Sequence, residues 1–334
     1  MSLPGPIPLN PAVSRAHVRD GRARWREIVC AVNAAHGQAL PDARKADRIL
    51  KRLSDEDTGA GRGVDLGPLT GVRVVIVPGF LSECVAFLAD VLSDATQHLE
   101  GLGARCSVAR VDGRGGSAHN ARQLRDHIMA LSQAEAGQLN LIIAMSKGTA
   151  DTLEMLAAYP ETHARLDVFV SLVGCVCGSP LADLVPDWLR WVERVLPLPT
   201  CRRHGGAAQS SLHPKTRTQF LHTNPMPSGI LYYSLGAVVD RAGMSKGMLS
   251  SFDALSRLSP LNDGQMLLAD QILPNSVFLG ALDCDHIATA MPFNRSGGVL
   301  ARFVKTRVLD QNAFPREVMA EALVRQALED LKLT

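Results

Sequence analysis

A serine between an apolar strand pattern and a helical pattern is the strongest chemical signal in the chain. Ser146 stands in the peptide AMSKG, directly after the apolar run 139–144 and before a helical segment that Pro160 ends. A serine at such a strand–turn–helix junction is a nucleophile elbow, because the turn exposes its hydroxyl while small flanking residues let the helix approach the strand. The helix start would also place partial positive charge beside an oxyanion formed there. The alternative is a serine that only caps the helix.

A histidine near the end of the chain is placed to act as the base for that serine. Of the ten histidines, only His286 follows the last apolar run, 276–282, and it lies in the loop-like stretch LDCDHIA. In chains with this kind of elbow the order is nucleophile, acid and then histidine. The base must reach the proton of the nucleophile beyond the carboxyl edge of a strand, where this loop would lie. A surface histidine without a role is the alternative.

The acid that would orient the histidine ring is left open by the residues alone. Asp263 lies in the turn PLNDG, 23 residues before His286, and Asp240 follows an earlier apolar run. Asp283 and Asp285 are too close to the histidine in sequence to orient its ring easily. Asp263 and Asp240 therefore remain as the two possible acids.

The peptide VPGFL at 77–81 follows the first strong strand pattern, where an oxyanion hole is expected. Such a loop supplies one backbone N–H to the oxyanion, and the residue after the nucleophile supplies the second. This assigns the two donors to the amides of Phe80 and Lys147. A simple β-turn around the Pro-Gly pair is the alternative.

The segments around these residues alternate between two kinds of pattern from residue 72 onward. Such alternation is typical of βαβ units, so we expect a mostly parallel sheet that is buried on both faces. A period of 3.6 residues predicts helices at 118–131, 149–158 and 315–333, the last with one apolar side. Apolar, β-branched runs predict strands at 72–77, 106–111, 139–144, 167–173, 229–235 and 276–282.

Residues 1–68 precede this alternation and are predicted to form an N-terminal arm with a helical extension. The arm, residues 1–11, is rich in proline. One helix is predicted from about Ser14 to His36 and a shorter one from about Asp42 to Leu53. Residues 69–334 are the predicted catalytic domain.

A second interruption, residues 180–228, is rich in proline and lacks a strand pattern. An insertion of this length in a compact domain is usually functional. A lid over a pocket and a helix packed permanently on the core are the two interpretations. Its apolar residues would form one stripe of a helix: Trp188, Leu189, Trp191, Val192 and Val195. The predicted substrate pocket comprises Leu81, Met145, Trp188, Trp191 and Ile287.

Composition argues against several other classes of protein. The 334 residues are 46% hydrophobic and 20% charged, as in globular enzymes, and the net charge of +2 gives no reason to expect nucleic acid as a partner. No apolar run reaches the ~18 residues that span a bilayer, and the first residues lack the features of a secretion signal. Seven cysteines then indicate reduced thiols and a cytoplasmic location. Cys175 and Cys177 are predicted to be buried thiols rather than metal ligands.

With these pieces assembled, residues 72–302 resemble the bacterial triacylglycerol lipases and related α/β-hydrolase esterases. The similar segments are VIVPGF, LNLIIAMSKGTAD, GSPLAD, LYYSLGAVVD and PLNDG before a late histidine. The resemblance implies an α/β-hydrolase fold, in which a mostly parallel sheet carries helices on both faces and a lid-like insertion. It also implies that the aspartate of the Asn-Asp-Gly turn, Asp263, is the acid that orients His286.

The chain departs from that family's pattern at three positions. Pro78 stands in place of a histidine in the oxyanion loop, and Ala144 replaces the first glycine of the elbow. Many of these lipases hold a structural calcium through an aspartate two residues beyond the catalytic histidine, a position that is Ala288 here. We therefore expect no metal, and the chemistry itself needs no cofactor.

Together these features predict a serine hydrolase that cleaves a carboxylic ester through an acyl-enzyme on Ser146. The expected partner is a small acyl substrate, and the N-terminal extension could support a homo-oligomer. An acyltransferase, a thioesterase or an amidase could use the same residues. A hydrolase fold without activity, used for ligand binding, is an alternative of a different class, although the order of serine, aspartate and histidine argues against it.

Overall fold

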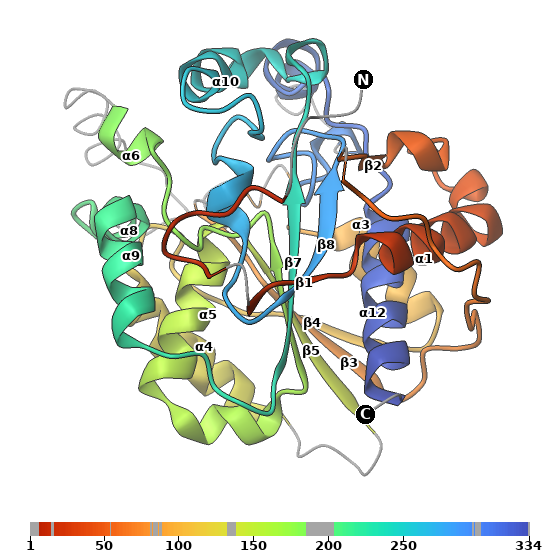
Figure 1. Ribbon diagram of the computed structural model, residues 1–334, viewed down its shortest axis with the longest axis horizontal. Helices are drawn as coiled ribbons and strands as arrows, with labels where there is room; N and C mark the ends of the chain where they lie inside the picture. Colours follow the sequence, from red (N-terminus) through yellow and green to blue (C-terminus); the bar gives the residue numbers. More distant parts are fainter. Residues whose placement is uncertain are drawn as a thin grey trace.

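A sheet of eight strands runs through the centre of the computed structural model, which describes residues 7–14, 17–53, 55–80, 82, 86, 89–131, 138–184, 204–295, 297 and 302–332. The order across the sheet is β1-β8-β7-β6-β5-β3-β4, and β2 also pairs with β8 (Figure 1). Neighbouring strands on this path are parallel, and β2 runs antiparallel to β8. The strands are β1 (Arg19–Asp20), β2 (Leu50–Lys51), β3 (Val72–Val77), β4 (Arg105–Val108), β5 (Leu139–Met145), β6 (Val168–Leu172), β7 (Leu231–Ala237) and β8 (Val277–Leu282).

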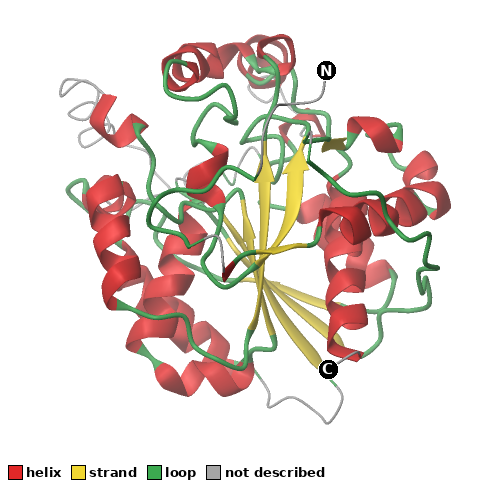
Figure 2. Ribbon diagram, in the orientation of Figure 1, coloured by secondary structure: helices red, strands yellow, loops and turns green. Residues whose placement is uncertain are grey.

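Helices cover both faces of this sheet, as Figure 2 shows. The α/β-hydrolase fold predicted from the sequence is therefore confirmed, and each of the six predicted strands overlaps one of β3 to β8. One face carries α1 (Arg22–Ala35), α3 (Ser93–Gly101) and α12 (Arg316–Lys332). The other carries α4 (Ser117–Ala130), α5 (Lys147–Ala158), α8 (Ala207–Leu212) and α9 (Pro214–Thr223). Figure 1 shows α6 (Leu181–Leu184) and α10 (Leu249–Ser256) beyond the carboxyl ends of the strands.

The central strands are buried on both faces, because consecutive side chains point to opposite sides of the sheet. Along β3, Val74 and Ile76 join the apolar cluster that includes Trp25 of α1, whereas Val75 and Val77 join the cluster on the other face. Every residue of β3, β5 and β6 is buried. This explains why the strands appear in the sequence as unbroken apolar runs.

The N-terminal extension is built into the edge of the sheet. Strand β1 pairs with the start of β8 and β2 with its end, so the extension covers an edge that would otherwise be exposed. The prediction of one helix from Ser14 was wrong at its start, because residues 19–20 pair with β8 and α1 begins only at Arg22. The prediction of a helix over 42–53 was also wrong. That segment contains one 3-10 turn, Ala46–Arg48, before β2.

Helix α12 is buried on more than its predicted apolar side. All residues from Arg316 to Ala327 are buried, including Glu321 and Arg325. The helix packs between α1 and α3, so its polar side faces protein instead of solvent. Buried ion pairs on this side are a structural feature that the periodicity of the sequence did not reveal.

The insertion after residue 180 contains helices and lacks strands in the parts that the structure describes. Helix α8 contacts α4 and α5, and its Ala208 is fully buried. The predicted apolar stripe with Trp188 and Trp191 lies in residues 185–203, outside the described residues. Within the described part of the chain, no helix combines the length and apolar character required to cross a bilayer.

Candidate active site

The turn between β5 and α5 holds Ser146 in a backbone conformation that non-glycine residues rarely adopt. Its φ is 54° and its ψ is −121°. Such a conformation costs about 1–3 kcal/mol and persists only where the surrounding structure enforces it. Here the N–H of Ser146 donates to the carbonyl of Leu172, and its carbonyl accepts from the N–H groups of Thr149 and Cys175, at 3.0–3.1 Å. The turn is thus fixed from both sides.

Gly148 explains how closely α5 approaches the neighbouring strand. A Cβ atom at this position would lie 2.6 Å from the carbonyl oxygen of Val77 and 2.7 Å from that of Pro78. Both are backbone atoms that cannot move aside without shifting the strand. The second small residue of the AMSKG peptide is therefore required by packing, as a nucleophile elbow demands.

A chain of two short hydrogen bonds connects Ser146 to a buried carboxylate. His286 Nε2 lies 2.9 Å from Ser146 Oγ, and His286 Nδ1 lies 2.7 Å from Asp263 Oδ2. The carboxylate is fully buried and the imidazole is 3% exposed. Because an ionised carboxylate only accepts, Nδ1 carries the proton and Nε2 is left to accept the serine proton.

Backbone and side-chain donors hold Asp263 in this orientation. Its Oδ1 accepts the N–H groups of Gln265 and Met266, each at 2.8 Å, and Oδ2 also accepts the side-chain amide of Gln271 at 3.2 Å. The N–H of His286 donates to the carbonyl of Asp263 at 3.0 Å. The turn PLNDG and the histidine loop are thus connected by both backbone and side-chain bonds.

The structure does not bring the other nearby aspartates to the imidazole. Asp240 is on the surface, 74% exposed, and forms an ion pair with Lys51 at 2.7 Å. Asp285 is buried, and its carboxylate accepts the N–H groups of Ser245 and Ala288 at 3.2 and 2.9 Å. Burial raises the pKa of Asp285, although these hydrogen bonds oppose the shift.

The loop after β3 lies directly against the serine. A Cβ on Gly79 would meet Ser146 Cβ at 3.0 Å and Met145 Sδ at 2.9 Å, so this contact requires glycine. Among the described residues, no acceptor is bonded to the amide N–H of Phe80 or of Lys147. Both amides are thus without an acceptor among the described residues, and Phe80 shares a cavity with Ser146.

The side chain of Lys147 turns away from this site. Its Nζ bonds both carboxylate oxygens of Asp151 at 2.7 Å, and each of these two side chains is 1% exposed. Asn120 of α4 donates to the same carboxylate at 2.8 Å. The side chain of Lys147 therefore joins α5 to α4 through Asp151.

A cavity of about 180 Å³ opens at Ser146 and His286. It has both apolar and polar walls, which suits an acyl group that carries a carbonyl oxygen. The other described residues that line it are Phe80, Cys175, Ser179, Leu181, Ala182, Gln209, Leu212, Gln265 and Met266.

The described residues include two of the five predicted pocket residues, Met145 and Ile287, and both belong to the core region. Met145 is part of the buried core and Ile287 packs against that core, and neither is among the described residues that line the cavity. Leu81, Trp188 and Trp191 lie outside the described residues. The lining that sequence reasoning missed comes from separate loops and from α8, for which no single motif exists.

The prediction that two cysteines are buried is confirmed, and one of them, Cys175, lines the cavity. Cys175 and Cys177 are buried, and burial raises the pKa of the Cys175 thiol to about 12. A thiol with so high a pKa stays protonated near neutral pH and is a poor nucleophile. Ser146 differs from this thiol because its Oγ lies 2.9 Å from a ring nitrogen of His286.

Two clusters of described side chains place three possible metal-ligand atoms within 4.8 Å of one another. In both clusters a carboxylate oxygen already bonds the histidine nitrogens, at 2.7–2.8 Å in one and 2.9–3.1 Å in the other. Neither cluster includes a residue that lines the cavity at Ser146. The clusters are His36, His98 and Glu321, and Asp112, His119 and His204.

The parallel sheet and the strained strand–turn–helix elbow define an α/β-hydrolase. Comparison with solved structures agrees with this class. The crystal structure of the metagenomic carboxyl esterase MGS0156 superposes with a TM-score of 0.89 at 36% identity, covering 98% of this chain and 97% of that one. This chain belongs to the same family of α/β-hydrolase esterases.

More distant structures share the fold. The mature Bacillus licheniformis lipase BlEst2 matches with a TM-score of 0.52 at 18% identity, covering 68% of this chain and 89% of that one. The Staphylococcus hyicus lipase matches with a TM-score of 0.54 at 12% identity, covering 82% of this chain and 100% of that one. No protein-family model and no curated protein matched the sequence.

Proposed function

We propose that the protein is a serine-dependent carboxylic ester hydrolase that works through an acyl-enzyme. One observation carries the proposal: the buried hydrogen-bonded chain Asp263–His286–Ser146 ends on a hydroxyl that faces a cavity. A carboxylate, an imidazole and a serine in this order raise the nucleophilicity of the hydroxyl. The carboxyl esterase at 36% identity supports an ester as the substrate class.

In the first half-reaction, Ser146 Oγ attacks the carbonyl carbon of the ester while its proton passes to His286 Nε2. The π electrons of the carbonyl move to its oxygen, which accepts hydrogen bonds from the amides of Phe80 and Lys147. The tetrahedral intermediate then collapses, the bond to the alcohol oxygen breaks, and that oxygen takes the proton from Nε2. Asp263 stabilises the imidazolium that exists between these steps.

In the second half-reaction, water enters the place that the alcohol has left. His286 Nε2 accepts one proton from the water as its oxygen bonds to the acyl carbon. Collapse of this second intermediate breaks the bond to Ser146 Oγ, which recovers its proton from the imidazolium. The carboxylic acid leaves, and the enzyme returns to its starting state.

A panel of chromogenic substrates tests the bond type. Esters of increasing acyl length, a thioester and an amide are compared on the wild-type protein and on His286→Ala. We expect hydrolysis of at least one ester to exceed that of the matched amide and thioester, and to be lost in the variant. An equal ester rate in the variant would contradict the mechanism. A higher rate on the thioester or amide would reassign the substrate.

A further inference from the structure

A buried arginine lies close to the loop that carries the proposed catalytic histidine. Arg316 is the first residue of α12 and is fully buried. A guanidinium has five N–H donors in a fixed plane, and each of these five has an acceptor here. The acceptors are Asp94 Oδ2 for Nε (2.6 Å), the carbonyls of Ala288 (2.7 Å) and Asn312 (3.2 Å) for one terminal nitrogen, and Asn294 Oδ1 (3.0 Å) and Asp42 Oδ2 (3.4 Å) for the other.

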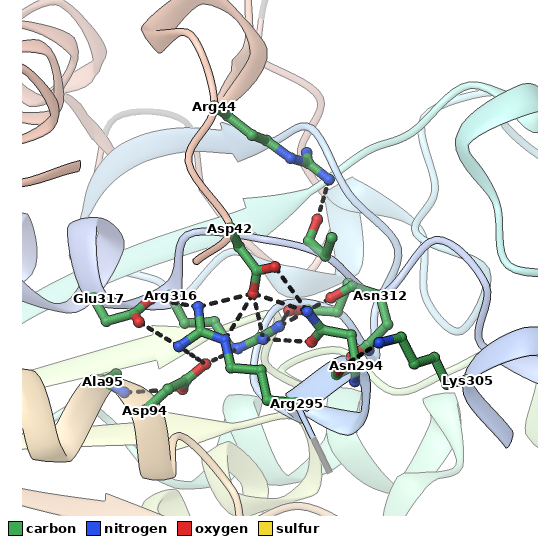
Figure 3. A network of polar contacts seen from close by, with 12 residues as sticks. Asp42, Arg44, Asp94, Ala95, Asn294, Arg295, Lys305, Asn312, Arg316 and Glu317 are labelled. Atoms are coloured by element: carbon green, nitrogen blue, oxygen red, sulfur yellow. Dashed lines mark hydrogen bonds and ion pairs between the residues drawn. The ribbon is translucent and has the colours of Figure 1, made fainter. Parts of the chain in front are cut away.

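These acceptors come from parts of the chain that are far apart in sequence. Figure 3 shows Asp42 of the N-terminal extension, Asp94 of α3 and Asn294, eight residues after His286, converging on Arg316. Arg295 joins the same network through Asp42 and Glu317. A single side chain therefore connects the extension, two helices and the loop.

The bond to Ala288 places this network two residues from His286. On the other side of the same turn, the N–H of Ala288 donates to Asp285 and the hydroxyl of Thr289 donates to the carbonyl of His286, at 2.9 and 2.7 Å. The turn is thus held by a carboxylate on its amide side and by the guanidinium on its carbonyl side. Loss of either would let the loop shift relative to Asp263.

A lysine could not replace this arginine. An ammonium is a compact charge with three donors, and it cannot meet five acceptors that lie around a planar fork. The guanidinium also lies among buried carboxylates, because Asp42 and Asp94 are 7% and 5% exposed, and Arg295 pairs with both as well.

We propose that Arg316 is a positioning residue for His286, and that Asp42 makes the N-terminal extension part of this positioning. The inference rests on the proposed function, because it assumes that His286 is the base. Arg316 is not among the described residues that line the cavity. Its loss should therefore lower kcat and leave KM nearly unchanged.

Arg325 supplies a matched control on the same helix. It is 4% exposed and bonds the carboxylate of Glu321 and the carbonyls of Asp65 and Gly67, so it is a second buried guanidinium that holds the extension. No bond among the described residues joins it to the histidine loop. Arg316→Lys and Arg325→Lys should both lower the melting temperature.

The test measures kcat, KM and the rate of Ser146 modification by a fluorophosphonate, well below the melting temperature of both variants. We expect Arg316→Lys to lower kcat and the modification rate by about 10- to 100-fold, because a small misplacement of a catalytic group has effects of this size. Arg325→Lys should stay within about twofold of the wild type in both rates.

Equal rates for the two variants would overturn the inference, as would a change confined to KM. If Arg316→Lys does not fold, Asp94→Asn takes its place, because it keeps the guanidinium and removes the charge facing Nε. A kcat of Asp94→Asn equal to that of the wild type would then overturn the inference. A wild-type protein that is not modified at Ser146 would instead overturn the proposed function, so the two failures are distinct.

Discussion

Polar side chains are buried in two regions, at the carboxyl edge of the sheet and in the layer formed by α1, α3 and α12. The two regions differ in where their hydrogen bonds end. At the edge, the chain from Asp263 through His286 ends on Ser146 Oγ, which faces a cavity. In the helical layer, the donors of Arg316 and Arg325 end on protein carboxylates and carbonyls. The first network is open at one atom, and we call the second closed because its guanidinium donors end within the protein.

This difference separates a chemical role from a structural one. Burying a polar group without a partner is costly, so a folded protein pairs nearly all of them. Strained residues such as Ser146 cluster at active sites, and its Oγ is both bonded to His286 and open to the cavity. A closed network stabilises the fold, and reaches the chemistry only where it touches the catalytic loop.

The largest loss of activity is expected at Ser146, the open end of the first network. Ser146→Ala should lower kcat/KM by on the order of 10⁴-fold or more, because no neighbouring group replaces the covalent step. The melting temperature should not fall, since the variant removes a hydroxyl and no packing. Ester hydrolysis and thermal denaturation of one preparation measure both. A variant that keeps its activity would show that the network is not catalytic.

The next largest loss of activity is expected at Asp263, the buried end of the same hydrogen-bonded network. Asp263→Asn should lower kcat by about 10⁴-fold, because the amide no longer holds the required histidine tautomer. Asp240→Asn is the control, since the Asp240 carboxylate pairs with Lys51 at the surface. Steady-state kcat values of the two variants test which aspartate is the acid. If Asp240→Asn proved the more damaging change, the acid would have to be reassigned.

A smaller loss is expected where the loop after β3 touches the serine. Gly79→Ala adds a Cβ that would meet Met145 Sδ at 2.9 Å and Ser146 Cβ at 3.0 Å, and should displace the Phe80 amide. Loss of one oxyanion donor lowers kcat by about 10²-fold. Gly101→Ala, whose added Cβ would have no neighbour within 4 Å, is the control. Similar kcat values for the two variants would contradict the oxyanion assignment.

The part of the closed network around Glu321 has no bond to the histidine loop among the described residues, and it should respond in stability alone. Glu321→Gln removes the charge that pairs with Arg325, His36 and His98, and should lower the free energy of unfolding by about 2–3 kcal/mol while kcat is unchanged. A fall in kcat measured on the folded variant would show that this part of the layer also reaches the active site.

The wild-type protein and Glu321→Gln should also differ in how the free energy of unfolding depends on pH. Burial opposes ionisation of Glu321, but hydrogen bonds from His98, His36 and Arg325 outweigh it and hold the pKa below its usual 4.5. A lowered folded-state pKa means that the stabilisation is complete above pH 4.5 and is lost as the pH falls through the folded value. Denaturant unfolding of both proteins should show a difference that shrinks below pH 4.5. A constant difference would contradict the ion-pair account.

The strands, and the places of Ser146 and His286 after them, were predictable from the sequence for one physical reason. A parallel strand buried on both faces needs an unbroken apolar run, so β3, β5 and β8 are visible without any tertiary information. Ser146 follows β5 directly, and His286 stands four residues after β8. The choice of Asp263 over Asp240 needed the family resemblance, because turn positions carry no periodic signal.

Other features depend on contacts that no local pattern encodes. The two-residue strands β1 and β2 form because they meet the edge of β8, and so short a segment has no periodicity. The periodicity of α12 shows its apolar side but does not show that the extension and α3 cover its polar side. The cavity lining is likewise assembled from separate loops, which explains why Ser179 and Gln265 were missed.

The most direct test of the central claim is chemical modification of the wild-type protein. A fluorophosphonate reacts covalently with an activated serine, and mass spectrometry of the digested protein locates the adduct. We predict one adduct, on the peptide that contains Ser146, formed in step with the loss of ester hydrolysis and absent in His286→Ala. An adduct on another serine, or complete loss of activity without modification of Ser146, would contradict the account.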